Sequence, residues 1–196
     1  MGKIFYVMGK SSSGKDTIYK KLKETYPRLR TVVPYTTRPV REGEKDGEEY
    51  YFVDGARFHA MEKDGRVLES RSYDTKCGVW TYFTADDGQI DLKTSDYLMI
   101  GTLVSYRALR ERFGKDALIP VYVEVEDGVR LTRALEREKQ QEKPQYAEMC
   151  RRFLADAEDF SEDRLSEAGI GRRFVNSDLD VCLEEIGGYI SREMSV

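Results

Sequence analysis

The sequence has few of the residues that hold disulfides and transition metals. Among 196 residues there are three cysteines and one histidine. Cys77, Cys150 and Cys182 are odd in number, far apart and without CxxC spacing, so we expect reduced thiols rather than a disulfide framework or a zinc site. The single histidine, His59, leaves little room for a catalytic triad, and we expect it to be a partly exposed polar residue on a helix.

Long apolar runs and an excess of basic residues are also missing. No apolar run approaches the length needed to cross a membrane. With 32 Lys and Arg against 36 Asp and Glu, the net charge is −4. This balance argues against nucleic acid as the main partner, because a surface that binds a polyanion usually shows excess positive charge. A first strand that begins almost at the N-terminus leaves no secretory signal, so we expect a cytoplasmic protein, as a monomer or homodimer.

What the sequence does contain is an alternation of apolar strands and amphipathic helices, within a length typical of one domain. Strands are expected at Ile4–Met8, Leu29–Val33, Tyr50–Val53, Val67–Tyr73, Cys77–Thr84, Tyr97–Ile100, Ala117–Val125 and Arg173–Val175, with Gln89–Leu92 as a candidate returning strand. Helices are expected at Lys15–Thr25, Ala56–Lys63, Thr102–Phe113, Gly128–Gln140, Gln145–Ala157 and Asp178–Glu193. The alternation predicts an α/β fold with a mostly parallel sheet. Residues 34–92, with short strands and turns, are expected to form an inserted mixed subdomain.

A glycine-bounded loop lies between the first strand and the first helix. It matches the pattern GxxxxGK, in which backbone N–H groups and the helix N-terminus point at phosphate oxygens and the lysine reaches the outer phosphates. This context favours a site for a nucleoside triphosphate over an ordinary Gly/Ser-rich turn. The expected ATP-binding residues of this loop are Gly9, Lys10, Ser11, Ser12, Ser13, Gly14, Lys15, Asp16 and Thr17.

The residue after the P-loop lysine departs from the usual pattern. A serine or threonine there normally helps to hold Mg²⁺, but this chain has Asp16, followed by Thr17. Two interpretations stay open. Asp16 either complements the positive end of the helix dipole or supplies a carboxylate to the Mg²⁺ that accompanies ATP.

A second candidate phosphate site lies in residues 36–51, which read TTRPVREGEKDGEEYY. Arg38 and Arg41 supply two guanidinium groups that could converge on one phosphate, with geometry that lysine cannot reproduce. Tyr50 adds a neutral donor. The alternative is a solvated charged loop, but a P-loop upstream favours a clamp for a phosphorylated acceptor.

This segment resembles the guanylate kinase signature TTRPxRxGExDGxxY, and the P-loop lies at the matching distance before it. The resemblance implies a P-loop NTPase fold with a five-stranded, mostly parallel sheet. It also implies three parts: a core (1–33, 93–130 and 158–196), an acceptor-binding subdomain (34–92) and a helical lid (131–157) that closes over ATP. The implied reaction is the transfer of a phosphoryl group from ATP, with Mg²⁺, to GMP.

The resemblance also implies roles for single residues. The acceptor phosphate would be held by Arg38, Arg41 and Tyr50, and the guanine edge by Glu69, unless Glu69 only anchors the subdomain. Around the migrating phosphoryl group we expect Lys15, Arg133, Arg137 and Arg152, and at the adenine site Asn176. An ordinary solvated helix face is the alternative for Arg133 and Arg137, and the neighbouring Arg151 leaves the register of Arg152 open.

The sequence departs from the family at the base and at the metal. Pro34 replaces a serine, Cys77-Gly78-Val79 replaces Tyr-Gly-Ser/Thr, and Met99-Ile100-Gly101 replaces Asp-x-Asp. We expect a Trp80–Leu92 hairpin in place of the helix that follows in the family. We hypothesise that Asp16 takes over the role of the missing acid, in which case an aspartate at position 99 should compensate for its loss. A kinase for another phosphorylated small molecule, such as ribose 1,5-bisphosphate, and a non-catalytic binding module remain as alternatives; the intact Gly14-Lys15 argues against the latter.

Overall fold

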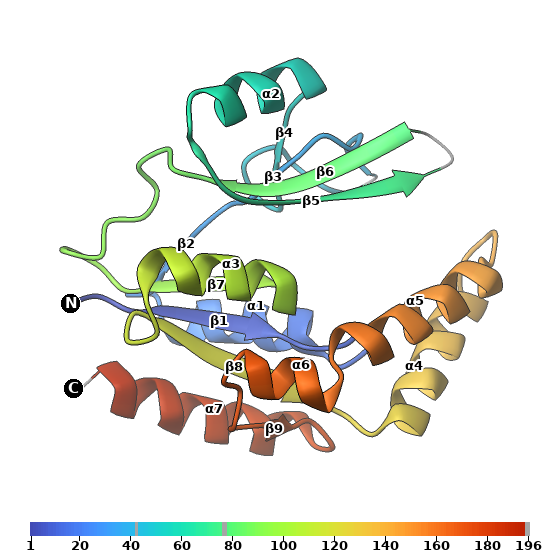
Figure 1. Cartoon of the computed structure of the whole chain (residues 1–196). Helices are drawn as coiled ribbons and strands as arrows, with labels where there is room; N and C mark the ends of the chain where they lie inside the picture. The colour runs from blue at the N-terminus through green and yellow to red at the C-terminus, as the bar shows by residue number, and fades with distance from the viewer. Residues whose placement is uncertain (42, 76–77, 195–196) are drawn as a thin grey trace.

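The computed structural model describes residues 1–41, 43–75 and 78–194. It contains two sheets that lie in separate layers (Figure 1). The larger sheet has the strand order β2-β7-β1-β8-β9, and every neighbouring pair is parallel. Its strands are β1 (Ile4–Met8), β2 (Arg30–Thr31), β7 (Tyr97–Gly101), β8 (Leu118–Glu124) and β9 (Phe174–Val175). The predicted five-stranded parallel sheet is confirmed.

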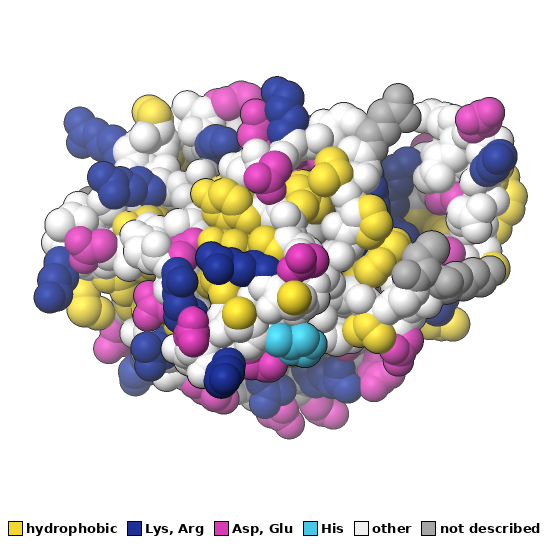
Figure 2. Space-filling view, turned by 90° about the horizontal axis from the view of Figure 1, so that it is seen from above, with side chains coloured by type: hydrophobic (Ala, Val, Ile, Leu, Met, Phe, Trp, Pro, Cys, Tyr) yellow, Lys and Arg dark blue, Asp and Glu magenta, His cyan; other side chains and the backbone are white. Residues whose placement is uncertain are grey.

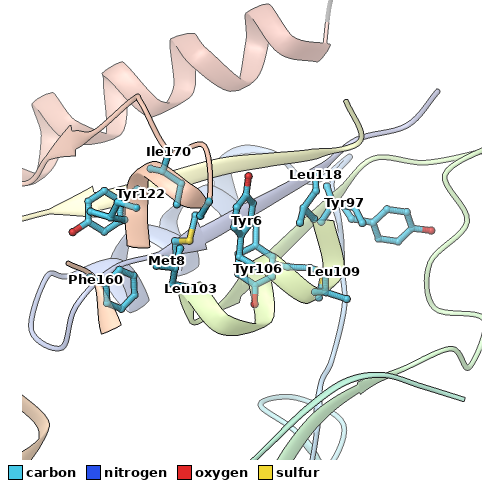
Figure 3. Packing of buried hydrophobic residues seen from close by; sticks show 14 of the residues in the cluster. Tyr6, Met8, Tyr97, Leu103, Tyr106, Leu109, Leu118, Tyr122, Phe160 and Ile170 are labelled. Atoms are coloured by element: carbon cyan, nitrogen blue, oxygen red, sulfur yellow. The ribbon is translucent and has the colours of Figure 1, made fainter. Parts of the chain in front are cut away.

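Helices cover both faces of this sheet because its central strand is apolar along its whole length. In β1, Phe5 and Val7 pack with α1 (Lys15–Thr25) and α7 (Leu179–Met194). Ile4, Tyr6 and Met8 point to the opposite face, toward α3 (Leu103–Phe113) and α6 (Glu162–Glu167). Figure 3 shows this second cluster, in which Tyr6 lies against Tyr106 and Met8 lies near Phe160. Alternate side chains of one buried strand thus contribute to two cores.

The smaller sheet is mixed and has the order β4-β3-β6-β5. Its strands are β3 (Tyr35–Thr36), β4 (Tyr51–Phe52), β5 (Val67–Thr75) and β6 (Gly78–Ala85). Phe58 and Met61 of α2 (Gly55–Lys63) pack on it against Phe83 and Ala85. Figure 2 views the molecule from above, and the histidine, His59, is visible at the surface as expected.

Two further helices extend from one side of the core (Figure 1). They are α4 (Asp127–Lys139) and α5 (Tyr146–Asp159), which pack against each other. Both correspond to predicted helices. None of the helices in the described ranges is long and apolar enough to cross a membrane.

The expected Trp80–Leu92 hairpin is wrong. Trp80 lies in β6, which pairs antiparallel with β5, so the hairpin joins these two strands. Residues 89–92 form no strand, because the Gln89 side chain binds the backbone of Val33 instead: Oε1 accepts from its N–H at 2.8 Å and Nε2 donates to its carbonyl at 3.1 Å. The sequence also missed β3 and α6, both very short elements, and the expected strand 29–33 is reduced to Arg30–Thr31.

Candidate active site

The P-loop follows β1 directly and ends where α1 begins. Gly14 is the N-cap of α1 and has φ 83°, in the left-handed region that favours glycine. A Cβ there would lie 2.4 Å from Asn176 Nδ2, and a Cβ on Gly9 would lie 2.4 Å from the Val123 carbonyl oxygen. The hydroxyls of Ser12 and Ser13 are buried and have no hydrogen-bond partner among the described residues. Both glycines are therefore required by packing, and the loop retains free donors for a ligand.

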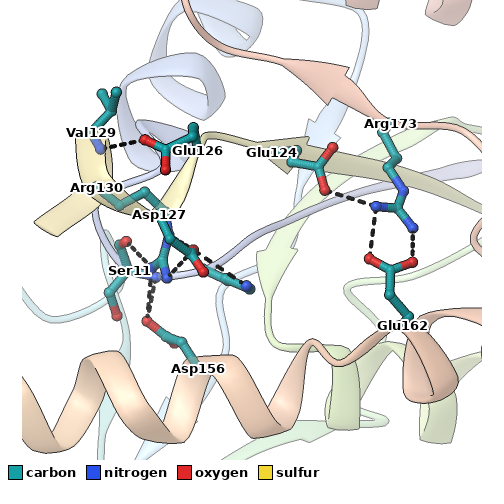
Figure 4. A network of polar contacts seen from close by, with 10 residues as sticks. Ser11, Glu124, Glu126, Asp127, Val129, Arg130, Asp156, Glu162 and Arg173 are labelled. Carbon is teal, nitrogen blue, oxygen red and sulfur yellow. Dashed lines mark hydrogen bonds and ion pairs between the residues drawn. The ribbon is translucent and has the colours of Figure 1, made fainter.

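Side chains from three later elements hold this loop in place. Asn176 Nδ2 donates to the Ser13 carbonyl at 2.8 Å. Arg130 of α4 donates to the Ser11 carbonyl, and Asp156 of α5 accepts from the Ser11 N–H, each at 2.8 Å (Figure 4). The Arg130 side chain is only 1% exposed. Neither Arg130 nor Asp156 was expected at the site, because both lie in helices that have the charge pattern of a solvated surface.

Asn176 therefore has an observed role in supporting the P-loop. The backbone carbonyl oxygen of Asn176 also accepts a hydrogen bond from Arg133 Nη2 at 3.3 Å, so this arginine of α4 is brought to the same end of the loop. Contact of Asn176 with adenine stays a prediction, as does contact of Arg133 with phosphate.

A cavity of about 320 Å³ lies between the P-loop and the two projecting helices. The P-loop contributes Lys15 and Asp16, α4 contributes Arg137, and α5 contributes Arg152; other lining residues include Ser11, Ser12, Glu138, Glu148 and Phe153. Lys15 Nζ lies 3.2 Å from Asp16 Oδ2. Six of the residues expected around a triphosphate thus share one cavity, and Lys15, Arg137 and Arg152 bring positive charge to it from three elements.

Glu148 orients the arginines of α5. Arg152 Nε donates to its Oε1 at 2.9 Å, and Arg151 Nε donates to its Oε2 at 2.7 Å. These hydrogen bonds, that from Arg151 foremost, lower the pKa of Glu148 to about 2. Arg152 lines the cavity, whereas Arg151 is not among its lining residues, so the geometry favours the register expected for Arg152.

On the smaller sheet, the expected phosphate clamp is built around Arg38. Its side chain is 3% exposed, and its guanidinium lies over the rings of Tyr50 and Phe52, at 5.1 and 5.2 Å from their centroids. Nη1 and Nη2 donate to the two oxygens of Glu44, at 2.7 and 2.6 Å. The Arg38 hydrogen bonds are the main cause that lowers the pKa of Glu44. Arg38 Nε is buried without a partner among the described residues, so one donor of the clamp is unused.

Arg41 and Tyr50 flank this pair. The Arg41 N–H donates to Glu44 Oε2 at 2.9 Å, and the residue is exposed. Burial raises the pKa of Tyr50, and the charge of Asp16 on the P-loop acts in the same direction. Glu44 was missed as a site residue, although it stands within the motif that marked the arginines.

Glu69 lies on β5 with its side chain 3% exposed. Thr84 Oγ1 of β6 donates to its Oε1 at 2.8 Å, while Oε2 has no hydrogen bond. Burial raises the pKa of Glu69, and the charge of Arg71, whose Nε lies 3.6 Å from Oε2, opposes this shift. Arg71 was missed by the sequence reasoning. The signal was available, since residues two apart on a strand share a face.

The structure explains why the strand-end acid of the family pattern is absent. A Cβ at Gly101 would lie 2.0 Å from the Tyr6 hydroxyl, which hydrogen-bonds Ser105 Oγ at 2.6 Å. Met99 is 3% exposed within the core. The expectation that an aspartate at position 99 could replace Asp16 is therefore wrong, because that carboxylate would be buried among apolar side chains.

The described residues hold no cluster of three or more His, Cys, Asp or Glu side chains suited to a metal ion. Asp16, 75% exposed beside Lys15, is the acid that the P-loop presents. This fits Mg²⁺, which usually keeps several waters and takes one or two carboxylates together with substrate phosphates. Asp16 would then hold the ion, while the phosphates of ATP and water molecules would supply the other ligands.

Comparison with known proteins finds similarity to one family. Residues 1–78 match the family model described as guanylate kinase. The guanylate kinase of Bradyrhizobium diazoefficiens is 47% identical over 68 residues, which are 35% of this chain and 31% of that protein. That of Nostoc sp. is 40% identical over 72 residues, 37% and 36% of the two chains. The matched part thus spans about a third of the length of these curated relatives.

The structural likeness extends much further along the chain. The crystal structure of guanylate kinase from Anaplasma phagocytophilum matches with a TM-score of 0.67 and 18% sequence identity. It covers 98% of this chain and 86% of that one. At this identity the match shows a shared fold.

Proposed function

Because this chain belongs through residues 1–78 to the guanylate kinase family and shares the guanylate kinase fold along almost its whole length, we propose that it transfers the γ-phosphoryl group of ATP to GMP. The observation that carries the proposal is that the basic residues expected to hold the two phosphorylated substrates gather in two separate places. One is the cavity that Lys15 shares with Arg137 and Arg152. The other is the clamp around Arg38.

The reaction requires positioning and charge neutralisation rather than a side-chain base. The acceptor phosphate oxygen is itself the nucleophile, so Arg38 and Arg41 need only hold it in line. Lys15, with the arginines of α4 and α5, would stabilise the charge that develops on the transferred group. We propose that these two helices form a lid, and its closure would keep out water, which otherwise competes as acceptor.

Glu69 would set the base preference. A carboxylate can accept hydrogen bonds from N1–H and the N2 amino group of guanine, and adenine does not present this pair of donors. A buried acceptor left without a donor costs about 1–3 kcal/mol, and the side chain of Glu69 is 3% exposed. AMP should therefore be the poorer substrate.

A coupled ADP-release assay tests this proposal with GMP, dGMP, AMP, UMP, CMP and sugar phosphates as acceptors, each with Mg²⁺ and ATP. We expect the highest kcat/KM with GMP. A sugar phosphate such as ribose 1,5-bisphosphate that outperforms GMP would replace the acceptor in the proposal. Absence of ADP release with every acceptor would favour a non-catalytic binding module.

A further inference from the structure

Arg71 has one occupied and one unoccupied edge. Its Nη1 donates to Thr102 Oγ1 at 2.8 Å and to Ser105 Oγ. Its Nε is buried without a hydrogen bond and forms an ion pair at 3.6 Å with Glu69 Oε2, which accepts no hydrogen bond from the described residues either. Nη2 makes no hydrogen bond to the described residues. Buried polar atoms are normally hydrogen-bonded, so a donor and an acceptor that meet only as a long ion pair leave hydrogen-bonding capacity for a ligand with the complementary pattern.

The occupied edge fixes the direction of the free one. Thr102 is the N-cap of α3 and Ser105 is its N3 residue, and the two form a capping box. Ser105 also pairs with the buried Tyr6 hydroxyl. This network holds Nη1 of the planar guanidinium. The N–H groups of Nε and Nη2 then point the same way, as a ready two-donor fork.

Building on the proposed function, we infer that Arg71 recognises the O6/N7 edge of the guanine base while Glu69 accepts from its N1–H. A two-pronged hydrogen bond from arginine to O6 and N7 is the pairing by which proteins most often identify guanine in DNA. N1–H and O6 are neighbours on the ring, and Glu69 Oε2 and Arg71 Nε are neighbours in the protein.

The polarity of this pair excludes adenine at both positions. Adenine presents an acceptor at N1, against the Glu69 carboxylate, and a donor at N6, against the Arg71 fork. The pair would also compensate for the base contacts that the family pattern places at positions 34, 79 and 101. Here position 79 is a valine that is 60% exposed, and position 101 has no room for a side chain.

The test compares Arg71→Met with the wild type. Arg57→Met, an exposed arginine of α2 in the same subdomain, is the matched control. Binding of GMP, 7-deaza-GMP and IMP is measured by calorimetry without ATP, and kcat/KM is measured with ATP. 7-Deaza-GMP lacks only the N7 acceptor, and IMP lacks only the N2 amino group.

We expect the wild type and Arg57→Met to bind GMP about ten- to a hundredfold more tightly than 7-deaza-GMP, as befits a hydrogen bond from a charged donor. Arg71→Met should lose this preference and keep the ratio of GMP to IMP. Because Arg71 also holds α3, Arg71→Lys serves as a second variant. It keeps the charge without the fork and should lose the N7 preference as well.

Equal loss of affinity for all three ligands in Arg71→Met would overturn the inference, since a purely structural role or a phosphate contact does not depend on N7. So would a wild type that does not discriminate against 7-deaza-GMP or does not bind GMP. A protein that binds GMP with the expected N7 preference yet releases no ADP would keep the inference and refute the proposed kinase activity. An active kinase whose two Arg71 variants keep the wild-type ratio of GMP to 7-deaza-GMP would refute the inference and keep the proposed kinase activity.

Discussion

Arg38 uses both the nitrogens and the flat face of its guanidinium group. Two nitrogens hold Glu44, the plane covers Tyr50 and Phe52, and Nε remains free. Lysine would keep the charge but could not make these contacts together. Arg41 lies next to the same carboxylate through its backbone and has an exposed side chain. This difference makes Arg41 the cleaner position at which to test the clamp.

Arg38→Lys and Arg41→Lys should each raise KM for the acceptor about tenfold or more, because a charge-assisted fork is lost. KM for ATP should stay near the wild-type value, since neither residue lines the cavity at the P-loop. Steady-state kinetics with each substrate varied in turn measures both constants, with Arg57→Lys as control. Equal damage to ATP and acceptor would argue against a dedicated acceptor site here.

Glu69 provides a prediction in pH. Burial raises its pKa, so it takes up a proton at a higher pH than an ordinary glutamate does. The protonated group loses one acceptor and its charge, and kcat/KM for GMP should therefore fall as pH decreases through this raised pKa. Glu69→Gln should remove that limb and lower the ratio of GMP to AMP by roughly ten- to a hundredfold. If Glu69→Gln keeps both the wild-type pH profile and the wild-type ratio of GMP to AMP, Glu69 serves only as an anchor of the subdomain.

The sequence identified these residues where a motif carried them, and failed where the fold supplied the partner. Arg38 and Glu69 stand in or near recognisable patterns. The partners of Arg71 are Thr102 and Ser105, some thirty residues later, and only the packing of α3 on β5 brings them together. The space filled by the Tyr6 hydroxyl at Gly101 is likewise a property of two neighbouring strands.

At the scale of elements, the P-loop and the first turn of α1 determine how Mg²⁺ could be held. Asp16 is exposed beside Lys15, and the strand-end positions offer no acid because Met99 is buried and Gly101 faces Tyr6. Asp16 is thus the acid that the loop itself presents, while Glu138 and Glu148 of the projecting helices line the same cavity. An acidic residue in a first turn also stabilises a helix by about 0.3–1 kcal/mol, so the two roles need separate measurements.

Asp16→Ala should raise the Mg²⁺ concentration needed for half-maximal activity severalfold or more, and Asp16→Ser should restore little, since serine supplies no charge. The double change Asp16→Ser with Met99→Asp should not recover activity, because the new carboxylate would be buried in the core. Mg²⁺ titrations at saturating ATP measure the dependence, and thermal unfolding measures the helix contribution. A normal titration for Asp16→Ser would leave only the helix-dipole role.

Elements were predicted well where local signals were strong and poorly where they were weak. The bounds of β1 and α1 are as expected, because an apolar strand, a glycine loop and an amphipathic helix follow one another. The two residues of β3 and the six of α6 carry too little periodicity to be recognised. Gln89–Leu92 has the composition of a strand, but the bonds of Gln89 to Val33 decide its course.

At the scale of the whole molecule, the P-loop and the projecting helices meet because the chain returns to the P-loop from distant elements. Arg130 and Asp156 reach Ser11, and Asn176 reaches Ser13, from more than a hundred residues away. The guanylate kinase family model matches residues 1–78, whereas the shared fold spans almost the whole chain. The later residues therefore hold the P-loop through these polar contacts, and Arg137 and Arg152 among them also line the cavity.

The most direct test of the account is the transfer of label from ATP radiolabelled in the γ-phosphate to GMP in the presence of Mg²⁺. We expect labelled GDP as the product, with kcat lowered roughly a hundredfold or more in Lys15→Ala, because that side chain would stabilise charge in the transition state. Arg57→Met should transfer label at the wild-type rate. Absence of labelled GDP with the wild type, or Lys15→Ala activity within a few-fold of it, would contradict the account.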